Sequence, residues 1–229
     1  MTITRIFLIG FILVSVFHIA TIILKKERAR RISKCLVVPF LLAVYISSDG
    51  SKFFLPIPAL ILGWIGDVLL IKIEKKVHFI LGLASFLLGH IFYTIAFVQI
   101  LGFFSTNGTA GAFNIPAIVI FVPPSIVLAM VVFRLIKPTK EMFFPVILYM
   151  TVLVVMNLFG FQVSLLYPGI AGLLILSGCF NFIVSDTILA YYTFRKLKLS
   201  GAVLIMVFYI LAQAEIILGL LLLNHSTLF

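Results

Sequence analysis

The sequence predicts an all-α, polytopic membrane protein. Its composition, its long apolar stretches and the placement of its basic residues support this prediction. Of its 229 residues, 63% are hydrophobic and only 10% are charged, whereas a soluble domain is about half apolar and about a quarter charged. So few charges could not cover the surface of a soluble fold, and a lipid bilayer must therefore surround much of the chain.

Eight apolar stretches are candidates for transmembrane helices, because a spanning helix needs about 20 predominantly apolar residues. The first is too long for the apolar region of a signal peptide and is expected to be retained. The second is the shortest of the eight. In chain order the stretches cover residues 3–24, 35–48, 53–71, 77–101, 115–136, 142–166, 169–192 and 201–224.

The basic residues predict the orientation of this helical bundle. All but two of the 17 lysines and arginines, Arg5 and Lys52, lie in or beside the linkers that follow the first, third, fifth and seventh stretches. The positive-inside rule places these linkers in the cytoplasm and both termini outside. Basic clusters also attract anionic lipid headgroups. The net charge of +10 therefore indicates membrane lipids as partners, and not nucleic acid.

No linker is long enough to form a soluble domain, so residues 1–229 are expected to form a single eight-helix transmembrane domain. The chain divides into two halves of four helices at the longest linker, 102–114. The third helix of each half carries a small residue followed by an aspartate, Gly66-Asp67 and Ser185-Asp186. A parallel repeat of this kind would bring Asp67 and Asp186 together across a pseudo-two-fold axis along the membrane normal.

Three of the seven acidic residues lie at bilayer depth, where a charge is costly and indicates function. Asp67 precedes Lys72 by five residues and Asp186 precedes Arg195 by nine, which places them roughly 8 and 13 Å from the cytoplasmic ends of their helices. Glu215 lies toward the external half of the last helix. It is expected to bond another helix or to stay protonated, outside the site of the two aspartates.

Several polar residues accompany these carboxyl groups. His90 and Tyr93 share one face of the fourth helix with glycines that allow close helix packing. Asn181 and Ser185 lie on one face of the seventh helix. Each of these residues could simply bond a neighbouring helix, but together they indicate a polar interior. The face of the fourth helix that carries His90 and Tyr93 also carries Gly82, Phe86 and Gly89, and the further polar residues are Asn157, Ser177, Tyr209 and Gln213.

Four segments in this order resemble the YhhN-like lysoplasmalogenase family over nearly the whole chain. They are Gly66-Asp67, residues 82–93, residues 185–190 and residues 209–213. The resemblance implies a membrane hydrolase that cleaves the vinyl-ether bond of lysoplasmalogens. The products would be a fatty aldehyde and a glycerophospho-ethanolamine or -choline. Asp67 and Asp186 match the family's proposed catalytic aspartates.

The implied chemistry needs one carboxylic acid to protonate the vinyl ether and one carboxylate to stabilise the resulting cation, as in glycosidases. Two neighbouring aspartates could share one proton for this purpose. No cofactor is expected. The supporting roles fall to His90 and Tyr93, which could position water or relay a proton, to Asn181 and Ser185, which could orient Asp186, to Tyr209 and Gln213 in the polar interior, and to Lys34, which could bind the substrate phosphate.

Other readings of the same residues remain open. A proton-coupled transporter of lipids or small molecules could use Asp67 and Asp186, because intramembrane aspartates commonly carry protons. Asp67, His90 and Asp186 could form an incomplete metal site, although no metal is predicted. A lysophospholipid esterase and a purely structural role are further alternatives. The compact chain favours a bacterial inner membrane over the endoplasmic reticulum.

Overall fold

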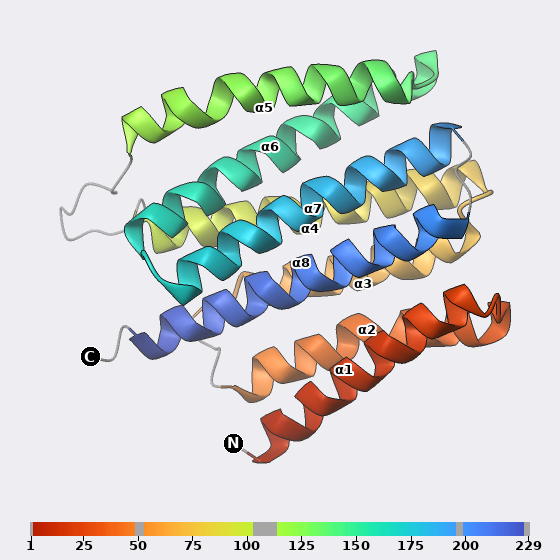
Figure 1. Cartoon of the computed structure of the whole chain (residues 1–229), viewed down its shortest axis with the longest axis horizontal. Coiled ribbons are helices and arrows are strands. Elements are labelled where there is room, and N and C mark those ends of the chain that lie inside the picture. Colours follow the sequence, from red (N-terminus) through yellow and green to blue (C-terminus); the bar gives the residue numbers. More distant parts are fainter. Residues whose placement is uncertain (1, 49–52, 103–113, 196–198, 227–229) are drawn as a thin grey trace. The chain divides into compact units, whose positions relative to one another are not determined.

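The computed structural model describes residues 2–48, 53–102, 114–195 and 199–226, and these ranges contain helices and turns but no strand. The predicted all-α fold is confirmed. Two short 3-10 helices, Leu70–Lys72 and Lys140–Met142, accompany the eight α-helices (Figure 1). The α-helices are α1 Thr2–Ile23, α2 Glu27–Ser47, α3 Pro56–Leu69, α4 Lys76–Ile100, α5 Ile115–Ile136, α6 Phe143–Leu166, α7 Ile170–Arg195 and α8 Leu199–Ser226.

Six of these helices, α1 and α4 to α8, are long and apolar enough to cross a membrane. The other two are not, for different reasons. With 14 residues, α3 is about 21 Å long at ~1.5 Å per residue, short of the roughly 30 Å hydrocarbon core. Helix α2 has 21 residues but opens with a basic segment. The chain is therefore a multi-pass membrane protein with six clear candidate spans.

Helix α2 begins at Glu27, eight residues before the predicted start at residue 35, so the expected basic linker is mostly helical. Glu, Arg and Ala favour helix, and an acidic residue in the first turn complements the helix dipole. Arg30 Nη2 donates to Glu27 Oε2 over 2.7 Å, and this bond lowers the pKa of the Glu27 carboxyl below its ordinary value. As a result Ser33 and Lys34 lie on a helix of defined geometry.

The chain forms two compact units, Met1–Tyr93 with Leu220–Phe229, and Thr94–Gly219. The linker 103–113, where the boundary of the four-plus-four repeat was expected, lies outside the described residues.

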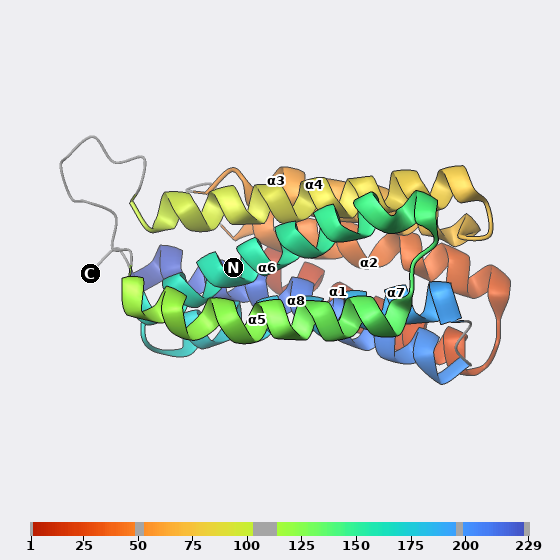
Figure 2. The ribbon, with the colours of Figure 1, turned by 90° about the horizontal axis from the view of Figure 1, so that it is seen from above.

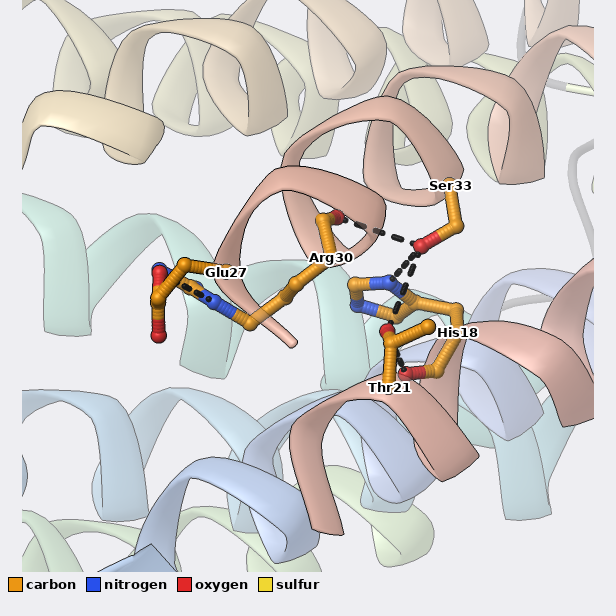
Figure 3. Close-up of polar contacts among 5 residues, drawn as sticks. All are labelled: His18, Thr21, Glu27, Arg30 and Ser33. Carbon is orange, nitrogen blue, oxygen red and sulfur yellow. Dashed lines mark hydrogen bonds and ion pairs between the residues drawn. The ribbon is translucent and has the colours of Figure 1, made fainter. Parts of the chain in front are cut away.

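In the first unit α1 and α2 pack side by side, joined by a short turn (Figures 1 and 2). At one end, Thr4 Oγ1 donates to the Ser47 carbonyl over 2.8 Å. Toward the other end, His18 is buried, and its Nδ1 atom lies 2.8 Å from Ser33 Oγ (Figure 3). The Ser33 hydroxyl also donates to the Arg30 carbonyl. These contacts fix α2 on α1 immediately beside Lys34.

Helices α3 and α4 approach closely because glycines face their partner. A β-carbon on Gly89 would lie 3.2 Å from the Ala59 carbonyl oxygen, and one on Gly82 would lie 2.8 Å from the Leu70 side chain. The close packing predicted for the glycines of the fourth helix is therefore present, and α3 is its partner. The backbone of α4 then supports the part of α3 that carries Asp67.

The second unit has a tightly packed part and a looser part. A β-carbon on Gly178 of α7 would lie 2.9 Å from the Ala212 carbonyl oxygen of α8, so these two backbones nearly touch. In contrast, only Ala117, Val132 and Ile136 of α5 are buried. A mostly apolar cavity of about 410 Å³ lies between α5 and α6, with Arg134 and Thr151 in its lining.

Candidate active site

Asp67 lies in the last turn of α3, in the first unit, and is 2% exposed. Its Oδ1 atom is 3.4 Å from the Nζ atom of Lys34 on α2, and the Lys34 side chain is 11% exposed. Two charged groups removed from water in this way need each other, because an unpaired buried charge is costly. This arrangement therefore presents Asp67 as a carboxylate beside an ammonium group.

The ion pair bears on the phosphate-binding role that the sequence predicts for Lys34. Lys34 was expected to hold a substrate phosphate, whereas its observed partner is the Asp67 carboxylate. Arg28 and Arg31 lie on the same basic segment of α2. Unlike that of Lys34, their side chains are exposed.

His90 and Tyr93 lie on α4 in the same unit as Asp67 and are 2% and 1% exposed. Their helix contacts α3 through Gly89 and Ala59. A buried histidine is a candidate for water positioning, because each imidazole nitrogen can donate or accept a hydrogen bond according to its tautomer. Lys34, Asp67, His90 and Tyr93 thus all belong to the first unit, and of these Lys34 and Asp67 are in contact.

Asp186 lies on α7, in the second unit, where it is half-buried. The hydroxyl of Tyr149, on α6, donates to Asp186 Oδ2 over 2.7 Å. Tyr149 is 7% exposed, and the bond has the ordinary length of an O–H···O hydrogen bond. Asp186 therefore has a neutral hydroxyl partner, in contrast to the cation beside Asp67.

The sequence-based reasoning did not find Tyr149. Its signal in the sequence is a hydroxyl well inside an apolar helix, eight residues before Asn157, which is one of the predicted polar residues. Positions eight apart share a helix face, and both residues are buried. Tyr149 therefore belongs to the same polar face of α6 as Asn157.

The other predicted residues of the second unit hold α7 and α8 together. Asn181 Nδ2 donates to Glu215 Oε2 over 2.8 Å, so the observed partner of Asn181 is Glu215. Ser185 Oγ donates to the Ile205 carbonyl over 3.1 Å. Tyr209 and Gln213 are buried on α8, with Gln213 Nε2 3.4 Å from the Tyr209 hydroxyl. Glu215 bonds another helix, one of the two behaviours expected of it.

Asp67 and Asp186 belong to different units, so their convergence stays a prediction. Within the described parts of the chain, no group of three or more His, Cys, Asp or Glu side chains is arranged to hold a metal ion.

These features define the class of protein. It is an all-helical, multi-pass membrane protein that carries a buried or half-buried aspartate in each of two units, each with its own polar partner. The chain belongs to the YhhN family, whose model matches residues 29–220. That range includes both aspartates and confirms the resemblance seen in the sequence. No curated protein and no solved structure matches the chain.

Proposed function

We propose that this protein is a membrane hydrolase that cleaves the vinyl-ether bond of lysoplasmalogens. The products would be a fatty aldehyde and glycerophospho-ethanolamine or -choline. The observation that carries the proposal is membership of the YhhN family over residues 29–220. The structure adds two carboxyl groups in different polar surroundings, and different surroundings are how enzymes give two carboxyl groups different roles.

The reaction begins with protonation of the β-carbon of the vinyl ether by a carboxylic acid. The resulting oxocarbenium ion takes up water at the α-carbon, and the water releases a proton to a base. The hemiacetal then collapses, breaking the bond between the α-carbon and the ether oxygen. One water is consumed, and one aldehyde and one alcohol are formed. The protein must therefore supply one proton donor and one negative group near the cation.

We assign the two roles from the partners of the aspartates. An ammonium group beside a carboxyl group favours its ionised form, and Lys34 lies beside Asp67. Asp67 would then stabilise the cation or activate water. Asp186 accepts a hydrogen bond from the neutral hydroxyl of Tyr149, which favours the ionised form less strongly than an ammonium group does. Asp186 would be the proton donor.

We further propose eight spans, with α2 and α3 crossing the membrane as a tightly supported pair and both termini outside. This arrangement keeps the basic linkers in the cytoplasm, and we place the protein in a bacterial inner membrane. A lysophospholipid substrate would enter with its phosphate at the cytoplasmic surface, near exposed Arg28 and Arg31. Its vinyl ether, close to the glycerol, would lie only a short distance below.

The test is aldehyde release from a lysoplasmalogen by the purified protein in detergent. Asp67→Asn and Asp186→Asn should each lower kcat per folded molecule by roughly 10²–10⁴-fold, the usual contribution of acid–base groups. Asp186→Asn should melt near the native protein, whereas Asp67→Asn should melt lower because it leaves Lys34 without its counter-ion. Glu74→Gln makes the same kind of change at an exposed carboxyl group and should leave kcat unchanged.

A well-folded native protein that releases no aldehyde from any vinyl ether would sink this proposal. Proton-coupled transport of a lipid or small molecule would then be the better reading. Reconstituted vesicles would show it as a substrate-dependent proton flux that Asp67→Asn and Asp186→Asn abolish.

A further inference from the structure

A proline inside α2 leaves one backbone carbonyl without its usual partner. In an α-helix the N–H of each residue donates to the carbonyl four residues before it. Pro39 lies inside α2 and has no N–H, so it cannot donate to the carbonyl of Cys35. That carbonyl instead accepts a hydrogen bond from Trp64 Nε1 on α3, over 2.9 Å. The Trp64 side chain of α3 thus supplies the hydrogen bond that this carbonyl of α2 lacks within its own helix.

This hydrogen bond lies next to the ion pair of Asp67. Cys35 directly follows Lys34 on α2, and Trp64 precedes Asp67 by three residues on α3, so the two contacts are adjacent along α2 and share one face of α3. The Lys34–Asp67 separation of 3.4 Å is longer than a charge-assisted hydrogen bond of about 2.7–2.9 Å. Lysine also has a flexible stem. The ion pair itself therefore does little to fix the register of α2 against α3.

We propose that Trp64 is a positioning residue for hydrolysis. Its indole N–H, bound to the carbonyl that Pro39 leaves open, fixes the register of α2 and α3 so that Lys34 stays beside Asp67. This inference rests on the proposed function, in which Asp67 acts as the carboxylate. The same geometry distinguishes Trp64 from a tryptophan that only anchors a helix at the membrane interface, where the N–H usually faces water or headgroups.

The exposure of Trp64 supports this role. Its side chain is 38% exposed, so the ring is only partly packed and its N–H is the atom with a specific partner. Trp64→Phe would remove the donor and keep an aromatic ring. Pro39→Ala would act from the other side, since alanine supplies an N–H four residues after Cys35 and competes with the indole for the same carbonyl.

The first measurement needs no activity, because Trp64 is the one tryptophan in the chain. Protein labelled with ¹⁵N-tryptophan in detergent micelles should give a single indole N–H signal with slow hydrogen exchange. Pro39→Ala should move this signal and speed its exchange. Pro124→Ala, at a proline inside α5, is the matched control and should change neither. An indole signal that is unaltered in Pro39→Ala would overturn the proposal.

The second measurement is kcat for aldehyde release in a double-mutant cycle. Trp64→Phe and Pro39→Ala should each lower kcat about tenfold, because small displacements of catalytic groups are costly, with KM within twofold of the native value. The double variant should be no slower than the slower single variant, since both changes remove one interaction. Pro39→Ala should melt at or above the native temperature, because it completes the helix.

The outcomes separate this inference from the proposed function. If the indole signal responds as expected but kcat is unchanged in both single variants, the hydrogen bond exists and the positioning role is wrong. Independent, multiplying losses of kcat would also overturn it. If the native protein releases no aldehyde at all, the proposed function fails, while the response of the indole signal still reports on the contact between α2 and α3.

Discussion

At the scale of single residues, the two aspartates differ in their partners. The ammonium group of Lys34 lies beside Asp67, and the hydroxyl of Tyr149 donates to Asp186. A carboxyl group with a neutral partner can exchange a proton without leaving a buried cation unpaired. This asymmetry gives a chemical basis for unequal roles, and it makes the partners as testable as the aspartates themselves.

Tyr149→Phe removes only the hydroxyl that bonds Asp186. A typical hydrogen bond contributes about 0.5–1.5 kcal/mol, so we expect kcat for aldehyde release to fall by up to about tenfold. Tyr191→Phe makes the same change at an exposed tyrosine of α7 and should have no effect. Equal rates for the two variants would show that the Tyr149 hydroxyl has no part in the reaction.

The bond between Asn181 and Glu215 is expected to be structural. Glu215→Leu leaves the Asn181 amide without its partner, which costs about 1–3 kcal/mol and should lower the melting temperature in detergent. Glu215→Gln keeps an acceptor oxygen and should melt close to the native protein. Because neither change touches Asp67 or Asp186, kcat per folded molecule should stay within twofold in both. A large loss of kcat in Glu215→Gln would place Glu215 in the reaction.

The sequence predicted these residues unevenly, and the reason is physical. Asp67, Asp186 and Glu215 stand out because a carboxyl group in an apolar helix is costly wherever that helix packs. Their partners depend on which helix faces which, and on rotation about each helix axis. Nothing local to Lys34 or Tyr149 encodes this, so the sequence predicted neither the contact of Lys34 with Asp67 nor that of Tyr149 with Asp186.

At the scale of the helices, glycine determines how closely neighbours approach. A β-carbon on Gly178 would lie 2.9 Å from the Ala212 carbonyl oxygen and from the Ile216 nitrogen of α8, and these backbone atoms cannot yield separately. Gly178→Ala should therefore force α7 and α8 apart. We expect it to cost about 1–3 kcal/mol, as overpacking typically does, and to lower the melting temperature.

Gly82→Ala is the matched comparison. Its new β-carbon would meet the side chain of Leu70, which can rotate away, so the loss in melting temperature should be clearly smaller than for Gly178→Ala. If the two variants melted alike, backbone contact would not be what limits the approach of α7 and α8.

The start of α2 differs from the prediction, because the helix begins at Glu27 and not at residue 35. The basic segment was expected to be a linker because charge in an apolar chain usually marks a loop. Its residues are nevertheless good helix formers, and Glu27 and Arg30 pair one turn apart. The remaining helices agree with the predicted stretches to within a few residues, because long apolar runs bounded by charged or polar residues leave little choice.

At the scale of the whole molecule, composition alone determined the class of protein. With 63% hydrophobic residues, the chain had to be a membrane protein, and six helices are long and apolar enough to span. The division into two compact units was not expected from the sequence, because it depends on contacts between residues far apart in the chain.

The proposed orientation can be tested by labelling single cysteines in intact cells. A variant that lacks Cys35 and Cys179 provides the background. A cysteine at Lys52 should react with a membrane-impermeant maleimide, whereas one at Lys75 should react only after the cells are opened, because basic linkers face the cytoplasm. Reaction at both positions in intact cells would overturn the proposed eight-span arrangement.

Helix α5 is held by hydrogen bonds at its two ends. Gln162 exchanges two hydrogen bonds of 3.0 Å with the backbone of Asn114 at its start, and Arg195 donates to the Leu135 carbonyl at its finish. Between these supports only a few side chains are buried. A helix held in this way can bend in its middle while both ends keep their orientation. Distances measured to a spin label at position 127 should therefore be broadly distributed. Distances to labels at positions 117 and 132 should be narrowly distributed.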